Sequence, residues 1–408
     1  MKNNVTHSRL LELLADACEL EHALCCSYLF SAFSIKRDLA DGLDWRQQQI
    51  TRLWASRIYH IAAQEMLHLA QVWNIMTAVG GSPYYGRPSF PQAAKHFPLD
   101  IALSLRRFDV ATLDRFLVYE RPEDTELEEA ELSVNLWPLD EGFQYDSVGE
   151  LYGEIARLLQ ELDEQSTFVG SLDMQADQEL IDFYDVMQVT NRESALQSID
   201  AILEQGEGSP EDREDSHFGV FTQLRRELNE AGFTPFLSVA DNPYIRAGTR
   251  QHLISTSSEF EKNGIAVTEV TNSDSIHAMD LFNDVYILML RALSHIFGTG
   301  TGEGAPRMRI ARNALELMIT VIKPLGEAIC RMPSGQEGLN AGPDFNLSRH
   351  VNFPRNSTIA EQLFIGKLRE LHGQGILLAS ATTGQIQHAQ IISAVGNLGR
   401  LSRISEGA

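Results

Sequence analysis

The segment from residue 44 to residue 80 carries apolar side chains at helical spacing along its whole length. Glu65 and His68 lie in the middle of it, three residues apart, so both side chains project from one face of a helix. They are in register with Ile61 and Val72, which places that face in a protein core. Burying a carboxylate is costly unless it is paired or bound to a metal. The segment therefore predicts either a buried Glu–His hydrogen bond or a metal site.

Three further segments have the same helical period, and together with the first they predict a fold. Residues 8–35 read as a first helix, residues 147–165 as a third, and a fourth starts near residue 191, breaks at 209–215 and resumes. A long Pro-rich connection, residues 83–147, joins the second helix to the third and contains a short helical piece, DVATLDRFLVYE. Four long helices with one long crossover predict an all-α, ferritin-like four-helix bundle.

The chain from residue 234 onward has a different character. An extended, proline-marked stretch comes first, followed by long helices with apolar faces and a Gly/Pro-rich coil. One of these helices should kink or divide at Pro324, because proline cannot continue a helical hydrogen-bond ladder. We expect residues 1–233 to form the bundle and residues 234–408 to form a helical extension packed on it.

Metal-type side chains recur on the core sides of three of the four bundle helices. The apolar stripe of the first passes through Glu21, and that of the fourth leads to Glu207 and resumes after the break at His217. With Glu65 and His68, they form a predicted ligand set of three carboxylates and two imidazoles. Such a set suits iron or manganese in a bundle core, whereas zinc prefers fewer, tetrahedral ligands.

The third helix departs from the usual pattern, in which it also supplies a glutamate. Tyr152 lies on its inward side, while Glu150 and Glu154 point away by helical geometry. Either the helix is rotated, or Tyr152 lines the site as a catalytic side chain and the ligand set is incomplete. Cys25, one turn after Glu21, is expected to be a buried free thiol.

Charge restricts the classes of partner. Lys and Arg number 33 against 56 Asp and Glu, a formal net charge of −23 that disfavours nucleic acid and anionic membranes. The acidic stretch that starts at Glu120, ERPEDTELEEAELS, is expected to be a solvated loop. No apolar run is long enough to cross a bilayer and the N-terminus has no signal core, which predicts a cytoplasmic protein.

Several stretches together resemble a known family. LEHALCCSYLF, QEMLHLAQVWNIMTAVGGSP, ELYGEI and EQGEG…SHFGVF are similar to the ferritin-like domain of the iminophenyl-pyruvate dimer synthases. DLFNDVYILMLRAL and GLNAGPDF extend the resemblance beyond the bundle, over most of the chain. The resemblance implies metal at the five predicted ligand positions and oxidative chemistry on reactive, amino-acid-derived imines in secondary metabolism.

Three functions follow as hypotheses. The first is a non-haem di-metal oxidase or oxygenase, with iron or manganese, that acts on a small amino-acid-derived substrate through O₂ or peroxide. The second is peroxide dismutation of the manganese-catalase kind. The third is a metal-binding or structural helical protein without catalysis. A homo-oligomer is compatible with each of the three.

Overall fold

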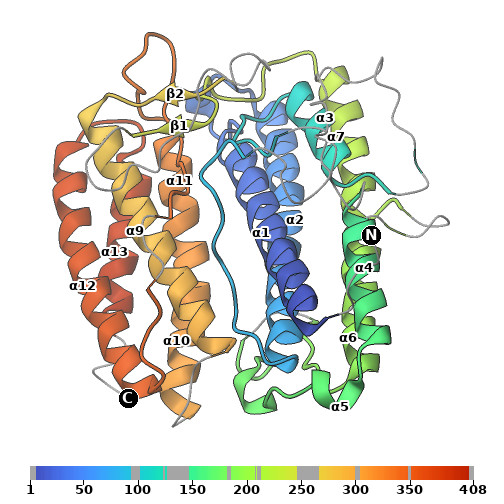
Figure 1. The fold of residues 1–408 in the computed structure, drawn as a ribbon. Helices are drawn as coiled ribbons and strands as arrows, with labels where there is room; N and C mark the ends of the chain where they lie inside the picture. Colours follow the sequence, from blue (N-terminus) through green and yellow to red (C-terminus); the bar gives the residue numbers. More distant parts are fainter. Residues whose placement is uncertain are drawn as a thin grey trace.

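The structure is a computed structural model in which the chain forms two helical layers side by side (Figure 1). The described residues are 6–92, 102–122, 125, 147–181, 185–206, 208, 213–245, 266–298, 304–347 and 351–403. The predicted all-α fold is confirmed.

The first two helices of the bundle are long and pack along each other. Helix α1 covers His7–Phe33 and helix α2 covers Trp45–Ala78, close to the expected 8–35 and 44–80. Thr6 caps α1 by accepting a hydrogen bond from the backbone N–H of Arg9, and Asp44 and Gln47 form a capping box at α2. A short 3₁₀ helix, η1 (Leu39–Asp41), lies in the turn between them.

The third and fourth positions of the bundle are each filled by two stacked helices. In Figure 1, α3 (Val110–Tyr119) lies above α4 (Val148–Glu161), and α7 (His217–Glu230) lies above α6 (Arg192–Gly206). Helix α3 packs on α7 and α4 packs on α6. Both columns of helices are thus interrupted near mid-height. The piece expected to belong to the crossover, residues 110–119, is therefore the upper part of the third column (Figure 1).

Shorter elements lie between the long helices. Helix α5 covers Glu164–Thr167, and the 3₁₀ helix η3 covers Leu172–Met174. Strands β1 (Pro243–Tyr244) and β2 (Thr268–Glu269) form a two-stranded parallel pair above the second layer.

The second layer consists of helices from the C-terminal part. These are α9 (Ser273–Ile296), α10 (Gly304–Leu317), α11 (Lys323–Ile329), α12 (Ser357–Ala381) and α13 (His388–Leu401). A π-helical stretch, η5 (Met318–Ile322), joins α10 to α11 immediately before Pro324. The predicted division at this proline is confirmed. Proline has no N–H to donate, so the helical ladder is rearranged ahead of it.

Aromatic side chains join the two layers. Phe33 of α1 lies 6.4 Å, ring centre to ring centre, from Phe282 of α9 and 6.3 Å from Phe345. Phe282 and Phe345 are 5.0 Å apart and nearly perpendicular. A Cβ on Gly326 of α11 would lie 2.4 Å from the Phe33 ring, so glycine is what lets α11 approach α1. The buried apolar residues form one continuous cluster from Leu10 to Leu401.

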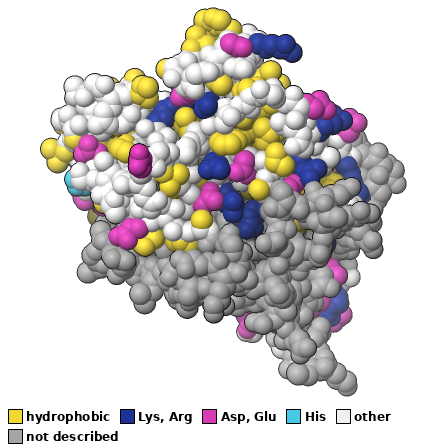
Figure 2. All heavy atoms as spheres, turned by 90° about the horizontal axis from the view of Figure 1, so that it is seen from above, with side chains coloured by type: hydrophobic (Ala, Val, Ile, Leu, Met, Phe, Trp, Pro, Cys, Tyr) yellow, Lys and Arg dark blue, Asp and Glu magenta, His cyan; other side chains and the backbone are white. Residues whose placement is uncertain are grey.

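The upper face of the molecule has a mixed surface. Figure 2 shows Lys and Arg interspersed with Asp and Glu among hydrophobic atoms in the part of this face that is described. The net charge of −23 is therefore not concentrated there. Within the described ranges, none of the helices combines the length and the apolar character that crossing a membrane requires.

Candidate metal site

Five titratable side chains meet inside the bundle at the height where its third and fourth columns are interrupted. Glu21 comes from α1, Glu65 and His68 from α2, Glu120 from the C-cap of α3, and His217 from the first position of α7. Each is at most 7% exposed. Side chains that are distant in sequence are thus brought into one closed space, which we call the Glu/His cluster.

The Glu/His cluster consists of two overlapping groups. Ligand-type atoms of Glu21, Glu65 and His68 all lie within 4.8 Å of one another, as do those of Glu65, Glu120 and His217. His68 Nδ1 is 3.4 Å from a Glu21 oxygen and 3.5 Å from Glu65 Oε2. His217 Nδ1 is 2.9 Å from Glu65 Oε1 and 3.5 Å from Glu120 Oε2. Glu65 thus offers one oxygen to each group.

Polar atoms in the centre of the cluster have no aligned hydrogen bond. Both carboxylate oxygens of Glu65 and both ring nitrogens of His217 are buried and make no aligned hydrogen bond among the described residues, although His217 Nδ1 and Glu65 Oε1 form an ion-pair contact at 2.9 Å. Leaving such atoms unsatisfied costs free energy, and the cost is greater for charged groups. Carboxylate and imidazole donors that converge on a shared space are the set that iron and manganese accept. The residues present therefore fit a pair of metal ions.

The outer atoms of the cluster are held by neighbouring side chains. His68 Nε2 donates to Gln205 Oε1 at 3.0 Å, which leaves Nδ1 free to face the carboxylates. The Tyr152 hydroxyl of α4 donates to Glu21 at 2.5 Å, and the Tyr28 hydroxyl of α1 donates to Glu120. Each outer carboxylate thus has one oxygen fixed by a tyrosine.

The charged side chains of the Glu/His cluster shift one another's pKa values. Burial raises the pKa of Glu21 to about 7, with His68 opposing the rise and Glu65 adding to it. Burial lowers the pKa of His217, but the charges of Glu120 and Glu65 outweigh it and the pKa rises to about 9. The pKa of His68 is likewise raised because Glu21 and Glu65 outweigh burial. The carboxylates therefore attract positive charge into this space, whether as protons or as metal cations.

Glu120 overturns one expectation from the sequence. It was expected to begin a solvated acidic loop, but its side chain is buried and reaches His217 and Tyr28. The signal lay in the preceding helix: Leu113 and Phe116 form the buried stripe of α3, and Glu120 continues it at helical spacing. Charge density in the following residues obscured that register. Glu120 occupies the part of the third column from which a bundle glutamate is usual.

The other predicted residues divide into three cases. Glu21, Glu65, His68 and His217 are brought together, and Tyr152 contacts Glu21. Glu207 lies outside the described residues; the residue before it, Gly206, would place a Cβ 3.5 Å from a Glu120 oxygen. Of the glutamates on the third predicted helix, Glu150 is exposed and Glu154 pairs with Arg157 at 2.7 Å. Both are directed away from the cluster.

Replacing Gln205 with alanine is expected to weaken metal binding about 10- to 100-fold, because His68 loses the acceptor that fixes its ring. Competition titration of Mn²⁺ and Fe²⁺ against a chelator measures the affinity. Gln223→Ala is the matched control, since Gln223 pairs with Glu227 away from the cluster. Equal affinities in Gln205→Ala and the parent protein would contradict a positioning role for Gln205.

Comparison with known proteins agrees with this fold and site. The ferritin-like family model matches residues 14–226, which is more than half of the chain. The chain therefore belongs to the ferritin-like family. All five members of the Glu/His cluster fall inside the matched residues 14–226.

Two characterised relatives extend the similarity beyond the bundle. The chain is 26% identical over 405 residues to dichlorochromopyrrolate synthase of Lentzea aerocolonigenes, covering 90% of this chain and 38% of that protein. It is 26% identical over 368 residues to 2-imino-3-(indol-3-yl)propanoate dimerase of Chromobacterium violaceum, covering 82% of this chain and 33% of that protein. The expected resemblance to imine dimer synthases is confirmed. The chain spans only about a third of the length of these relatives.

A solved structure supports the fold. The crystal structure of a ferritin-like protein from Caulobacter vibrioides superposes with a TM-score of 0.50 and 21% identity. The matched region covers 77% of this chain and 94% of the Caulobacter chain. At this identity the likeness establishes the architecture alone.

Proposed function

We propose that the chain is a non-haem di-metal oxidase that oxidises a small, aromatic, amino-acid-derived imine or acid in secondary metabolism. The observation that carries the proposal is the Glu/His cluster, in which two buried ligand groups share Glu65 and the close contact between Glu65 and His217 is not an aligned hydrogen bond. A purely structural Glu–His pair would satisfy its own atoms by hydrogen bonding.

In this proposal Glu21, Glu65 and His68 hold one ion, and Glu65, Glu120 and His217 hold the second. Iron is favoured, with manganese as the alternative, because both accept mixed carboxylate and imidazole donors. Glu207 was predicted as a ligand from its register, and we retain it as a candidate. Such ions, when bound, supply the electrons and the Lewis acidity for reaction with O₂ or peroxide.

The surrounding residues have positioning roles. Tyr152 fixes one oxygen of Glu21, and Tyr28 fixes one oxygen of Glu120. Gln205 sets the tautomer of His68. Near-complete burial of all five cluster residues keeps bulk water from the reacting centre. We therefore assign Tyr152, the predicted catalytic residue, to orientation of Glu21.

The substrate class comes from the similarity to the synthase and the dimerase. The second relative, 2-imino-3-(indol-3-yl)propanoate dimerase, is named for the dimerisation of an indolyl imino acid. Joining two such molecules by a new bond between them removes two electrons and two protons. Hydrogen peroxide can accept these and become two molecules of water, or O₂ can accept them and become peroxide. A small-molecule substrate of this kind suits a buried metal site.

The proposal is tested by metal content and turnover of the purified full chain. Inductively coupled plasma mass spectrometry should find about two Fe or Mn per chain after anaerobic reconstitution. The loaded protein should consume 2-imino-3-(indol-3-yl)propanoate, generated in solution, in the presence of peroxide or O₂. Rapid peroxide disproportionation without consumption of the imine would favour the catalase-like alternative. Background metal after reconstitution would favour the non-catalytic alternative and contradict the proposal.

A further inference from the structure

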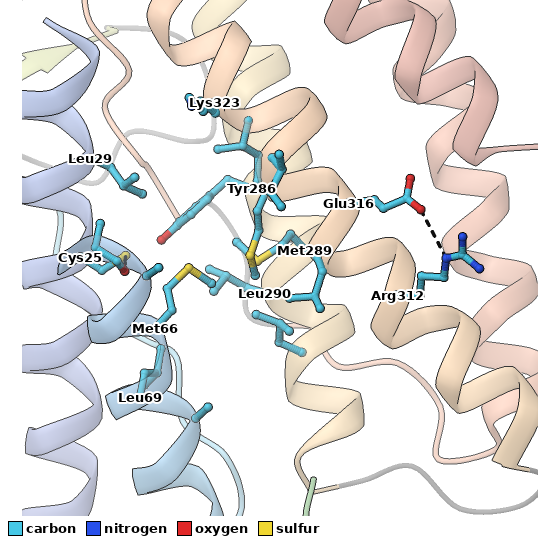
Figure 3. A pocket seen from close by; sticks show the side chains of 18 of the residues that line it. Cys25, Leu29, Met66, Leu69, Tyr286, Met289, Leu290, Arg312, Glu316 and Lys323 are labelled. Atoms are coloured by element: carbon cyan, nitrogen blue, oxygen red, sulfur yellow. Dashed lines mark hydrogen bonds and ion pairs between the residues drawn. The ribbon is translucent and has the colours of Figure 1, made fainter. Parts of the chain in front are cut away.

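A large cleft separates the bundle from the second helical layer. Its volume is about 900 Å³, and its walls come from α1 and α2 on one side and from α9, α10 and η5 on the other. Figure 3 shows Cys25, Leu29, Met66 and Leu69 on the bundle side facing Tyr286, Met289 and Leu290 across the opening. The volume is within the range of sites for small organic molecules, roughly 300–1,000 Å³.

The walls of the cleft suit a flat aromatic ligand. They are mainly apolar and include the thioethers of Met66, Met289, Met308 and Met318. Methionine adapts its shape and its sulfur makes favourable contacts with aromatic rings. Tyr286 extends across the cleft (Figure 3), and its hydroxyl is held in place by donating to His22 Nε2 at 2.6 Å.

One end of the cleft carries a positive charge. The Lys323 ammonium lies 4.3 Å from the centre of the Tyr59 ring, and no described carboxylate lies within ion-pair distance of it. The nearby Glu327 is paired with Arg37 and also accepts from the Tyr59 hydroxyl at 2.7 Å. Its negative charge is thus already compensated, and Lys323 is left to pair with an anion from solution. The other charged side chains of the lining are Glu179 and the pair Arg312–Glu316, whose atoms are 3.4 Å apart (Figure 3).

The cleft lies directly behind the Glu/His cluster. Cys25 lines it and follows Glu21 by one turn of α1, while Ala62 lines it and precedes Glu65 by one turn of α2. The Cys25 thiol donates to the backbone carbonyl of Ala62 at 3.4 Å, so α1 and α2 are in contact at this wall of the cleft. The wall at Cys25 and Ala62 is therefore one helical turn away from Glu21 and Glu65.

We infer that this cleft is a binding site for an aromatic carboxylate of amino-acid size, with the ring between Met66 and Met289 and the carboxylate on Lys323. If the cleft holds the substrate of the metal centre, the inference rests on the proposed function. It also explains why residues after 233 accompany the bundle, since α9, α10 and η5 supply the second wall.

Binding of indole-3-propionate to the purified full chain, measured by isothermal titration calorimetry, tests the inference. A neutral matched probe, 3-(indol-3-yl)propan-1-ol, lacks only the carboxylate charge. Lys323→Met keeps the aliphatic stem and removes the cation, so it should weaken binding of the acid about tenfold and leave the alcohol unchanged. Ala63→Phe, at an exposed position that lines the cleft, should weaken both probes by filling the space.

Lys367→Met serves as the charge-matched control, because Lys367 lies on α12 and pairs with Glu370 at 2.8 Å. The inference is overturned if the parent protein shows no saturable binding of the acid, or if Lys323→Met and Ala63→Phe bind both probes as the parent does. Metal content is measured on the same samples. A protein that carries two ions per chain but does not bind the acid refutes the binding site in the cleft and leaves the metal proposal intact. A protein that binds the acid but carries only background metal supports the binding site and refutes the metal proposal.

Discussion

Replacing Glu65 with alanine is expected to remove metal from both halves of the Glu/His cluster. Glu65 is the one residue common to both ligand groups, so its loss leaves each with two of the ligands that the described residues supply. Metal content should fall from about two ions per chain to background, and turnover should fall with it. The fold should survive, because α2 is held by its long buried apolar face and its capping box, to which Glu65 does not contribute. Mass spectrometry of metal and far-ultraviolet circular dichroism measure the two effects.

Two companion variants make the Glu65 experiment specific. Glu120→Ala should retain about one ion per chain, because Glu21, Glu65 and His68 remain as a complete group. Glu154→Ala, which disturbs only a surface pair with Arg157, should retain both ions. Full metal content in Glu65→Ala would show that the ligand assignment is wrong. Loss of both ions in Glu120→Ala would show that the two groups are not separable.

Replacing Phe282 with alanine is expected to destabilise the protein by about 3–5 kcal/mol, the usual cost of emptying a large aromatic position in a core. Phe282 is fully buried and packs on Phe33 of the bundle and on Phe345. The free energy of the first unfolding transition in urea measures the loss. The substitution acts where the two layers meet, so it also tests their coupling.

A matched control for Phe282 is Leu377→Ala on α12, where the side chain is 73% exposed. Its effect should be within about 0.5 kcal/mol. If Phe282→Ala leaves the transition unchanged, the aromatic contact does not join the layers. If instead residues 234–408 melt separately while the bundle persists, the two predicted regions are independent domains and the inferred cleft would open with them.

Helical period alone indicated much of the bundle. The apolar stripes of α1, α2, α4, α6 and α7 are long enough that register fixed which side chains point inward. Glu65 and His68 are three residues apart on α2, so they were predicted to act together without any tertiary information. The break before His217 was visible as Gly, Pro and acidic residues, and the break in the third column was not recognised.

Glu120 shows why the site was only partly predictable. It ends a ten-residue helix, α3, which was treated as part of a long connection. A short amphipathic piece does not reveal which column of a bundle it will join, because that depends on contacts with distant helices. Its packing on α7 brings Glu120 to His217, nearly a hundred residues away in sequence, and no local pattern encodes that distance.

The sequence by itself determined the all-α class, the inward faces of the long helices and four side chains of the Glu/His cluster, because these depend on the period of a single helix. Tertiary structure decided that Glu65 is shared, that Glu120 joins the cluster, and that Tyr28, Tyr152 and Gln205 hold its outer atoms. It also decided the cleft, whose two walls come from opposite halves of the chain. These features depend on side chains from different elements meeting in space, which is set by packing between helices and not by the spacing within any one of them.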